Sequence, residues 1–154
     1  MPSEKLLSFK DIMSKVGEFI FHWSLLEIQL AEILTAKGRS IEGGLTERLE
    51  RWSECVPIHM QSELDEIRAQ TLLIRDTRNV IVHGLNGGCS AGGPDQSHII
   101  CLLGGHKSPG EGQISITMTD LEDLCQATDA CRRAFINPDY FNYRLSKDWS
   151  LAPR

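Results

Sequence analysis

The chain has 154 residues, of which 41% are hydrophobic and 24% charged, which is typical of one folded domain and excludes a disordered protein. Its net charge of −5 excludes a general nucleic-acid coat protein, because such proteins carry excess positive charge. The sequence has no secretory signal pattern and no uninterrupted apolar stretch long enough to span a membrane, so we expect a cytoplasmic protein without a membrane partner.

The first predicted element is a long helix over residues 4–37, because its apolar residues recur at intervals of three and four. Ser3 is the expected N-cap and Gly38 the expected stop signal. A second apolar stripe consists of Phe21, Leu25 and Ile28. A helix that is apolar on two sides is buried on two sides, so we expect this second stripe to contact a partner chain.

Two further helices are predicted over residues 45–55 and 61–83, with Gly84 ending the second of them. The apolar stripe of the helix at 61–83 consists of Leu64, Ile67, Thr71, Ile74, Ile81 and Leu85. The Gly-, Ser- and Asn-rich stretch from residue 84 to 97 is predicted to be a loop.

A β-hairpin over residues 98–118 and a last helix over 120–136, capped by Thr119 or Asp120, complete the regular elements. The tail over 137–154 is too aromatic for a linker, so we expect it to pack on the domain. Its aromatic residues are Tyr140, Phe141, Tyr143 and Trp149. The predicted fold is mainly α: one domain over residues 1–154, forming an up-and-down four-helix bundle with a small β-hairpin insertion between helices 3 and 4.

The five cysteines form no CxxC pair and are odd in number, which predicts free thiols. The histidines other than His83 have no ligand-like spacing with one another or with the cysteines; they are His22, His59, His98 and His106. We therefore expect no metal ion and no cofactor, with a zinc site built from separated Cys and His residues as the alternative.

The segment RDTRNVIVHG, at residues 75–84, is the candidate functional site. On a helix projection at about 100° per residue, Arg78 falls within the apolar stripe, where an unpartnered guanidinium costs several kcal/mol to bury. His83 lies at the end of the same helix and diverges from Arg78 by about 140°. The two side chains meet only if the last turn unwinds or if they flank a groove shared with a second subunit. Arg binds phosphate through paired hydrogen bonds and His transfers protons near neutral pH, which suits phosphodiester cleavage without a metal.

This segment, at the end of a bundle helix, resembles the Arg–polar–x3–His motif of HEPN-domain proteins. The sequence FHWSLLEIQLAEIL in the first helix, and a hairpin that enters the last helix through MTDLEDL, are similar to the same family. The resemblance covers roughly Val16 to Phe135. It implies a helical bundle that forms a homodimer, with two Arg–His motifs side by side in one cleft.

The resemblance also implies an activity, since many HEPN domains are metal-independent endoribonucleases of toxin–antitoxin and other defence systems. His83 would act as general acid or base on the ribose 2′-hydroxyl and the leaving 5′-oxygen, and Arg78 would neutralise the transition state. Asn79 would orient the phosphate or the histidine. The RNA product would carry a 2′,3′-cyclic phosphate, and an antitoxin protein is an expected partner.

Other residues of the candidate site have supporting roles. The family pattern makes Glu27 the acidic partner of Arg78, with a solvated glutamate as the alternative. Asp76 projects about 20° from His83 and is placed to orient it. Arg68 and Arg75 project at the edge of the stripe that holds Arg78, and are candidate contacts for RNA phosphates.

The competing hypothesis is a non-catalytic HEPN-like module that binds a nucleotide, RNA or a protein partner, or that only dimerises. Arg78 would then form a structural ion pair. Under either hypothesis, the net charge of −5 confines RNA binding to a narrow arginine-lined cleft and makes it strongly salt-dependent.

Overall fold

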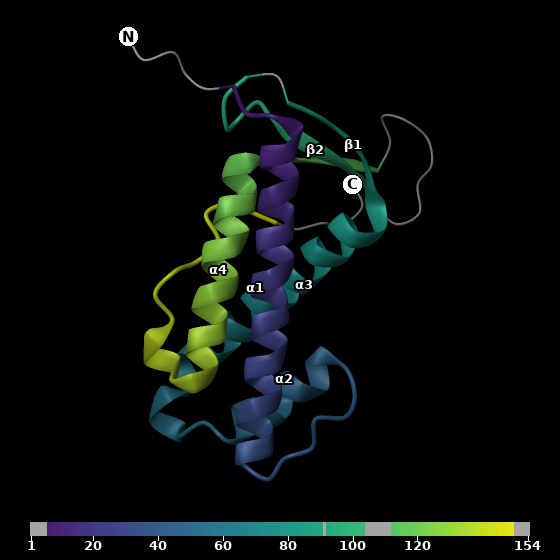
Figure 1. The fold of residues 1–154 in the computed structure, drawn as a ribbon. Helices are drawn as coiled ribbons and strands as arrows, with labels where there is room; N and C mark the ends of the chain where they lie inside the picture. The colour runs from purple at the N-terminus through teal and green to yellow at the C-terminus, as the bar shows by residue number, and fades with distance from the viewer. Residues whose placement is uncertain (1–5, 91, 104–111, 150–154) are drawn as a thin grey trace.

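The computed structural model describes residues 6–90, 92–103 and 112–149. Figure 1 shows a mainly helical fold with a small sheet at one end, which confirms the mainly α part of the predicted fold class. The α-helices are α1 (Phe9–Ala36), α2 (Leu45–Glu54), α3 (Leu64–Gly84) and α4 (Met118–Ile136). The strands are β1 (Leu85–Cys89), β2 (His98–Leu102) and β3 (Gln113–Thr117), and the 3-10 helices are η1 (Ile58–Glu63) and η2 (Pro138–Tyr140).

The direction of the helices differs from the up-and-down order that the sequence predicts. α1 and α4 lie side by side and run in the same direction, away from the sheet, while α3 crosses obliquely toward the sheet (Figure 1). The short α2 lies near the far end of α1 (Figure 1). The strand insertion explains why α4 is parallel to α1. Its last strand, β3, ends at the end of the molecule where α1 begins, and α4 follows β3 directly. A simple up-and-down bundle would make α1 and α4 antiparallel.

The start of α1 is fixed by a capping box at Ser8. The Asp11 amide donates to the Ser8 hydroxyl over 3.1 Å, and the Ser8 amide donates to the Asp11 carboxylate over 2.9 Å. The expected start at residue 4 is therefore wrong, because residues 6–8 are not helical; Ser3 lies outside the described residues. Gly38 follows the helix with φ of 68°, as its stop role requires.

α1 is long and apolar enough to cross a membrane, by the criteria of length and composition. Its buried side chains nevertheless form one side of the hydrophobic core. They are Ile12, Val16, Phe19, Trp23, Leu26, Leu30 and Leu34. Core helices of soluble proteins and signal sequences meet the same two criteria. Phe21 and Ile28, of the predicted second stripe, are exposed on its other side.

The insertion is a three-stranded antiparallel sheet in the order β1-β2-β3, rather than a two-stranded hairpin. β2 and β3 pair as predicted, with Ile99 opposite Ile116, and both side chains are buried. The predicted loop over 84–97 is wrong in its first part, because residues 85–89 form the edge strand β1. Leu85 belongs to this strand and is exposed, so it does not extend the apolar stripe of α3.

The turn from α3 into β1 requires a glycine at position 84. A Cβ atom there would lie 2.3 Å from the carbonyl oxygen of Leu102 in β2. The close approach anchors the end of α3 against the sheet. The chain that joins β2 to β3 lies mostly outside the described residues.

α4 begins at Met118, two residues earlier than the sequence predicts. The N-cap is Thr117, not Thr119 or Asp120; its hydroxyl accepts from the Asp120 amide over 3.0 Å, and Asp120 closes the capping box. A hydroxyl at Thr119 cannot cap the helix because it already lies within the first turn. The predicted C-terminal end at Ile136 is confirmed.

The aromatic tail packs against the helices, as predicted, except at Tyr140. Phe141 and Trp149 are buried and Tyr143 is partly buried, whereas Tyr140 is 52% exposed. Gln70 of α3 secures the middle of the tail. Its amide donates to the Tyr143 carbonyl over 3.2 Å, and its side-chain oxygen accepts from the Leu145 amide over 2.9 Å.

Asp123 of α4 secures the end of the tail. Its buried carboxylate accepts from the Tyr143 hydroxyl over 2.7 Å and the Trp149 indole nitrogen over 3.2 Å. The Ser146 amide donates to both carboxylate oxygens, over 2.9 and 3.1 Å. Burial raises the pKa of Asp123, but the hydrogen bonds from these three residues outweigh burial and hold the pKa below its ordinary value.

Candidate functional site

The candidate motif lies on a helix that stays regular to its end. α3 is α-helical through Gly84, so the last turn does not unwind between Arg78 and His83. The two side chains therefore diverge by about 140° and do not face one another within one chain. Of the two arrangements that would bring them together, only a groove shared with a second subunit is compatible with this helix.

Arg78 is half-buried at the edge of the core face of α3. Thr77 and Ile81, on the same helix, are fully buried. The centre of the buried face of α3 therefore lies at these residues, and Arg78 lies at its edge. The guanidinium donates from Nη1 to the side-chain oxygen of Asn79 over 2.8 Å. Its Nε atom is buried without a hydrogen-bond partner in the described part of the chain. Asn79 thus holds Arg78, and the guanidinium keeps donors for an anion.

His83 is exposed in the last turn of α3. No hydrogen bond to its ring is present among residues 6–90, 92–103 and 112–149. Its apolar neighbours Val82 and Leu85 are also exposed. The imidazole is therefore accessible to solvent or to a second subunit.

Asp76 binds Arg75 rather than His83. The Asp76 carboxylate and the Arg75 Nη2 atom are 2.9 Å apart, and Arg75 also donates to the Thr46 hydroxyl over 3.4 Å. Asp76 lies about two helical turns from His83, a rise of about 10 Å, which is too far for a direct hydrogen bond. Within one chain, Asp76 does not orient the histidine.

The other predicted residues are not gathered around Arg78. Arg68 pairs with Asp65 over 2.8 Å and donates to the Ser53 hydroxyl over 3.5 Å. Glu27 is exposed on α1, and in the described structure it forms no ion pair with Arg78. Local carboxylates neutralise Arg68 and Arg75, so the predicted basic strip is reduced to Arg78.

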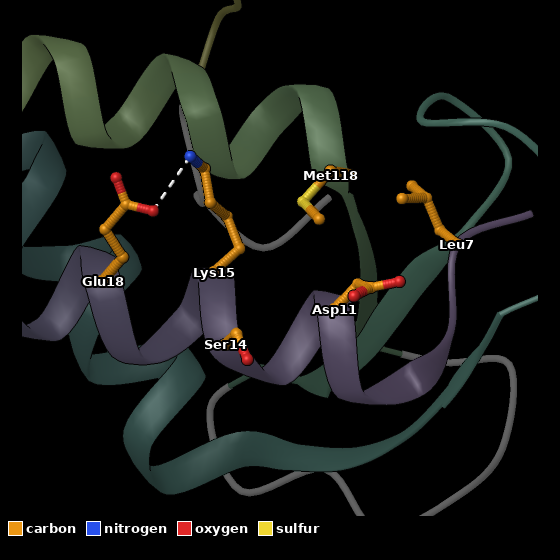
Figure 2. Close-up of a pocket in the computed structure, with 6 residues that line it drawn as sticks. All are labelled: Leu7, Asp11, Ser14, Lys15, Glu18 and Met118. Atoms are coloured by element: carbon orange, nitrogen blue, oxygen red, sulfur yellow. Dashed lines mark hydrogen bonds and ion pairs between the residues drawn. The ribbon is translucent and has the colours of Figure 1, made fainter. Parts of the chain in front are cut away.

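The hollows on the surface lie elsewhere, in the groove between α1 and α4. The first, of about 330 Å³, lies at the start of both helices, with the Lys15 ammonium directed to the Glu18 carboxylate over 3.0 Å (Figure 2). Its lining residues are Leu7, Asp11, Ser14, Lys15, Glu18 and Met118. The second, of about 270 Å³, follows along the groove and shares Lys15 and Glu18 with the first. No residue of α3 lines either hollow.

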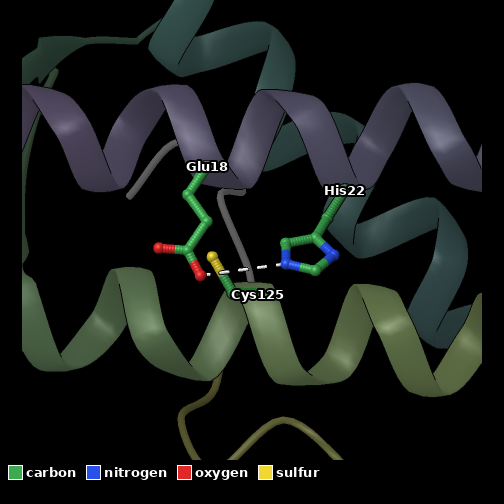
Figure 3. Close-up of side chains that lie close together, drawn as sticks. All are labelled: Glu18, His22 and Cys125. Atoms are coloured by element: carbon green, nitrogen blue, oxygen red, sulfur yellow. Dashed lines mark ion pairs between the residues drawn. The ribbon is translucent and has the colours of Figure 1, made fainter.

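The second hollow contains a group of side chains that sequence reasoning missed. Glu18 and His22 of α1 face Cys125 of α4 (Figure 3), and their ligand atoms all lie within 4.8 Å of one another. The sequence alone could predict that Glu18 and His22 lie together, because they are four residues apart and so share one helix face. Cys125 could not be assigned to this face without knowing how α4 lies against α1.

All five cysteines are free, as predicted. Burial raises the pKa of Cys101 and of Cys131 to about 11 and that of Cys125 to about 12. These three thiols are therefore protonated near neutral pH and are not candidate nucleophiles.

Comparison of the chain with known protein families, curated proteins and solved structures finds no match. A function must therefore be inferred from the side chains themselves.

Proposed function

We propose that this chain is a metal-independent endoribonuclease of the HEPN type that acts as a homodimer. The observation that carries the proposal is the state of Arg78. Of the three arginines of the candidate site, it alone has no carboxylate partner in the described structure, since Arg68 and Arg75 are paired. Its neutral partner Asn79 orients the guanidinium without neutralising it. Such a group suits a phosphate whose negative charge grows in the transition state.

His83 supplies the proton transfer in the proposed reaction. It takes the proton from the ribose 2′-hydroxyl, whose oxygen attacks the adjacent phosphorus, or it returns a proton to the leaving 5′-oxygen. The bond to the 5′-oxygen breaks, leaving a 2′,3′-cyclic phosphate and a 5′-hydroxyl. Two copies of His83 in one cleft would divide the acid and base roles, each contributing about 10²–10⁴-fold.

A second subunit is part of this proposal because Arg78 and His83 diverge within one chain. Exposed apolar side chains near His83 support an interface there: Val82 and Leu85 are 46% and 39% exposed. Phe21 and Ile28 give α1 a further exposed apolar stripe. A cleft between two subunits would also bring two copies of Arg78 together on an acidic protein. We propose that such an enzyme acts in the cytoplasm as a toxin or defence component restrained by an antitoxin protein.

The test is cleavage of single-stranded and structured RNA by the full chain in EDTA. We expect Arg78→Ala and His83→Ala each to lower the rate by about 10²–10⁴-fold, with cyclic-phosphate ends in the wild-type product. His59→Ala, at an exposed histidine of η1, is the matched control. Equal rates for wild type and His83→Ala would refute the proposal, as would loss of activity in EDTA while circular dichroism shows the protein still folded.

One observation favours a second candidate, a non-catalytic RNA- or nucleotide-binding module: Arg78 and His83 do not meet within one chain. Calorimetry with RNA separates the two functions. A binding module loses affinity in Arg78→Ala, is unaffected by His83→Ala, and cleaves nothing.

A further inference from the structure

Glu18, His22 and Cys125 bring together one oxygen, one nitrogen and one sulfur ligand in the groove between α1 and α4 (Figure 3). Their ligand atoms lie within 4.8 Å of one another. In a tetrahedral zinc site, bond lengths of about 2.0–2.3 Å place neighbouring ligand atoms about 3.3–3.7 Å apart. Side-chain movements of about 1 Å would therefore close the triangle around one ion. Both helices are parts of the core and hold the ligands from opposite sides of the groove.

Glu18 keeps a carboxylate lone pair, and His22 keeps a ring nitrogen, available to bind an ion. Lys15 donates to one oxygen of Glu18 over 3.0 Å, which fixes the carboxylate, while the other oxygen lies 3.8 Å from the His22 Nε2 atom. The His22 Nδ1 atom is buried and has no hydrogen-bond partner in the described structure. Figure 3 shows Nε2 directed toward Glu18 and Cys125 and Nδ1 on the far side of the ring, so the ion would bind Nε2 and Nδ1 would keep the ring proton.

The charges that line this hollow favour a cation. Two carboxylates, from Glu18 and Glu122, face the single ammonium of Lys15, which lies 3.0 and 3.4 Å from them. The third carboxylate, of Asp129, is already paired with two arginines of α4. The arginines leave one excess positive charge beside Asp129, but the carboxylates around Lys15 leave one excess negative charge beside Glu18. A divalent cation that displaces one thiol proton adds one positive charge and neutralises it.

We propose that Glu18, His22 and Cys125 bind Zn²⁺ in the groove between α1 and α4. A mixed oxygen, nitrogen and sulfur set suits Zn²⁺ better than Mg²⁺ or Ca²⁺, which prefer oxygen ligands throughout. On binding, the Cys125 thiol releases its proton to solvent and the sulfur coordinates as thiolate. Water completes the fourth position, because the hollow of about 270 Å³ is open to solvent. The ion cross-links α1 to α4 and should stabilise the fold.

The experiment uses the full chain, stripped of metal by chelation and then titrated with Zn²⁺ against a chromophoric competitor. We expect one site per chain. His22→Ala and Cys125→Ser should each weaken binding by more than the about 10- to 100-fold that loss of an outer-shell partner costs. His59→Ala and Cys89→Ser are the matched controls, because both residues are exposed and lie outside the groove.

Cobalt substitution tests the sulfur ligand directly. Co²⁺ in the same site should show a thiolate-to-metal charge-transfer band that Cys89→Ser retains and Cys125→Ser loses. Zn²⁺ should also raise the Tm of the wild type but not of His22→Ala. If Cys125→Ser fails to fold, Glu18→Gln tests the site at a half-exposed position. Wild-type affinity in the ligand variants, no charge-transfer band in the wild type, or binding that Cys89→Ser removes would overturn the proposal.

This site is separate from the ribonuclease motif, which lies on α3. Zinc binding by a protein without ribonuclease activity would support the zinc site and not the ribonuclease. EDTA-resistant cleavage by His22→Ala would support the ribonuclease independently of the zinc site.

Discussion

Replacing Asp123 with alanine is expected to detach the C-terminal tail from the helices. The carboxylate is the shared acceptor for donors from Tyr143, Ser146 and Trp149. No other acceptor for the Trp149 indole nitrogen is present in the described structure. Removal of Asp123 therefore affects the tail at three points, although the substitution lies on α4.

The size of the effect follows from the burial of each donor. Hydrogen bonds to a charged group contribute about 1.5–3 kcal/mol, and a buried donor left without an acceptor costs about 1–3 kcal/mol. Trp149 is 1% exposed, so its indole nitrogen cannot turn to water, whereas the exposed Ser146 can be rehydrated. We expect Asp123→Ala to lower the free energy of unfolding by about 3–5 kcal/mol, and Tyr143→Phe by about 1–2 kcal/mol.

The assay is urea unfolding followed by tryptophan fluorescence and circular dichroism. Tyr140→Phe is the matched control, because Tyr140 belongs to the same tail, is 52% exposed, and its hydroxyl has no partner in the described structure. It should change stability by less than about 0.5 kcal/mol. If Tyr143→Phe matches Tyr140→Phe, or Asp123→Ala costs less than about 1 kcal/mol, Asp123 does not secure the tail.

Two further predictions concern the ends of helices. Gly84→Ala should destabilise the fold by about 1–3 kcal/mol, because the new Cβ would lie 2.3 Å from the Leu102 carbonyl. Gly17→Ala, in mid-helix with open space around it, should instead stabilise by about 0.5–1 kcal/mol; thermal unfolding that gave both the same sign would contradict this. Thr117→Ala should cost about 1 kcal/mol as a lost N-cap, and Thr119→Ala almost nothing; the reverse order in urea would contradict the assigned cap.

The helices were predictable because their apolar residues recur strongly at intervals of three and four, and these same residues form the hydrophobic core. The errors lie at their starts, where two hydroxyl residues compete for one cap. Ser8 has a carboxylate three residues later, Asp11, whereas Ser3 has Leu6, so the capping-box spacing could have placed the start of α1 correctly. The same spacing does not decide the start of α4, because Thr117 is followed by Asp120 and Thr119 by Glu122.

Strand β1 could not be predicted from its own residues. Its sequence, LNGGC, has neither apolar alternation nor β-branched residues, which are the local signals of a strand. It is extended because the end of α3 is held against β2 and the next residues find hydrogen-bond partners there. Tertiary contact, not propensity, makes this edge strand.

The candidate motif on α3 was only partly predictable. The helix projection placed Arg78 on the apolar stripe, and the position of His83 at the helix end indicated that it would be exposed. The partners of the nearby arginines could not be predicted, because they depend on residues from other elements. Thr46 of α2, for example, meets Arg75 across the helix interface. Which arginine keeps free donors is therefore a property of the folded chain.

The cluster at Glu18, His22 and Cys125 depends on the direction and register of α4 against α1. One strand insertion follows α3, which runs toward the sheet, so α4 must start at the sheet end and run parallel to α1 (Figure 1). In that register the third turn of α4 meets the fourth turn of α1, and Cys125 comes to face His22 (Figure 3). The up-and-down order expected from the sequence would reverse α4 against α1 and so change which side chains of α4 face Glu18 and His22. The zinc proposal therefore rests on the orientation and register of α4 as well as on the residues, and a thiolate band that Cys125→Ser and His22→Ala each remove would support the contact between these two turns.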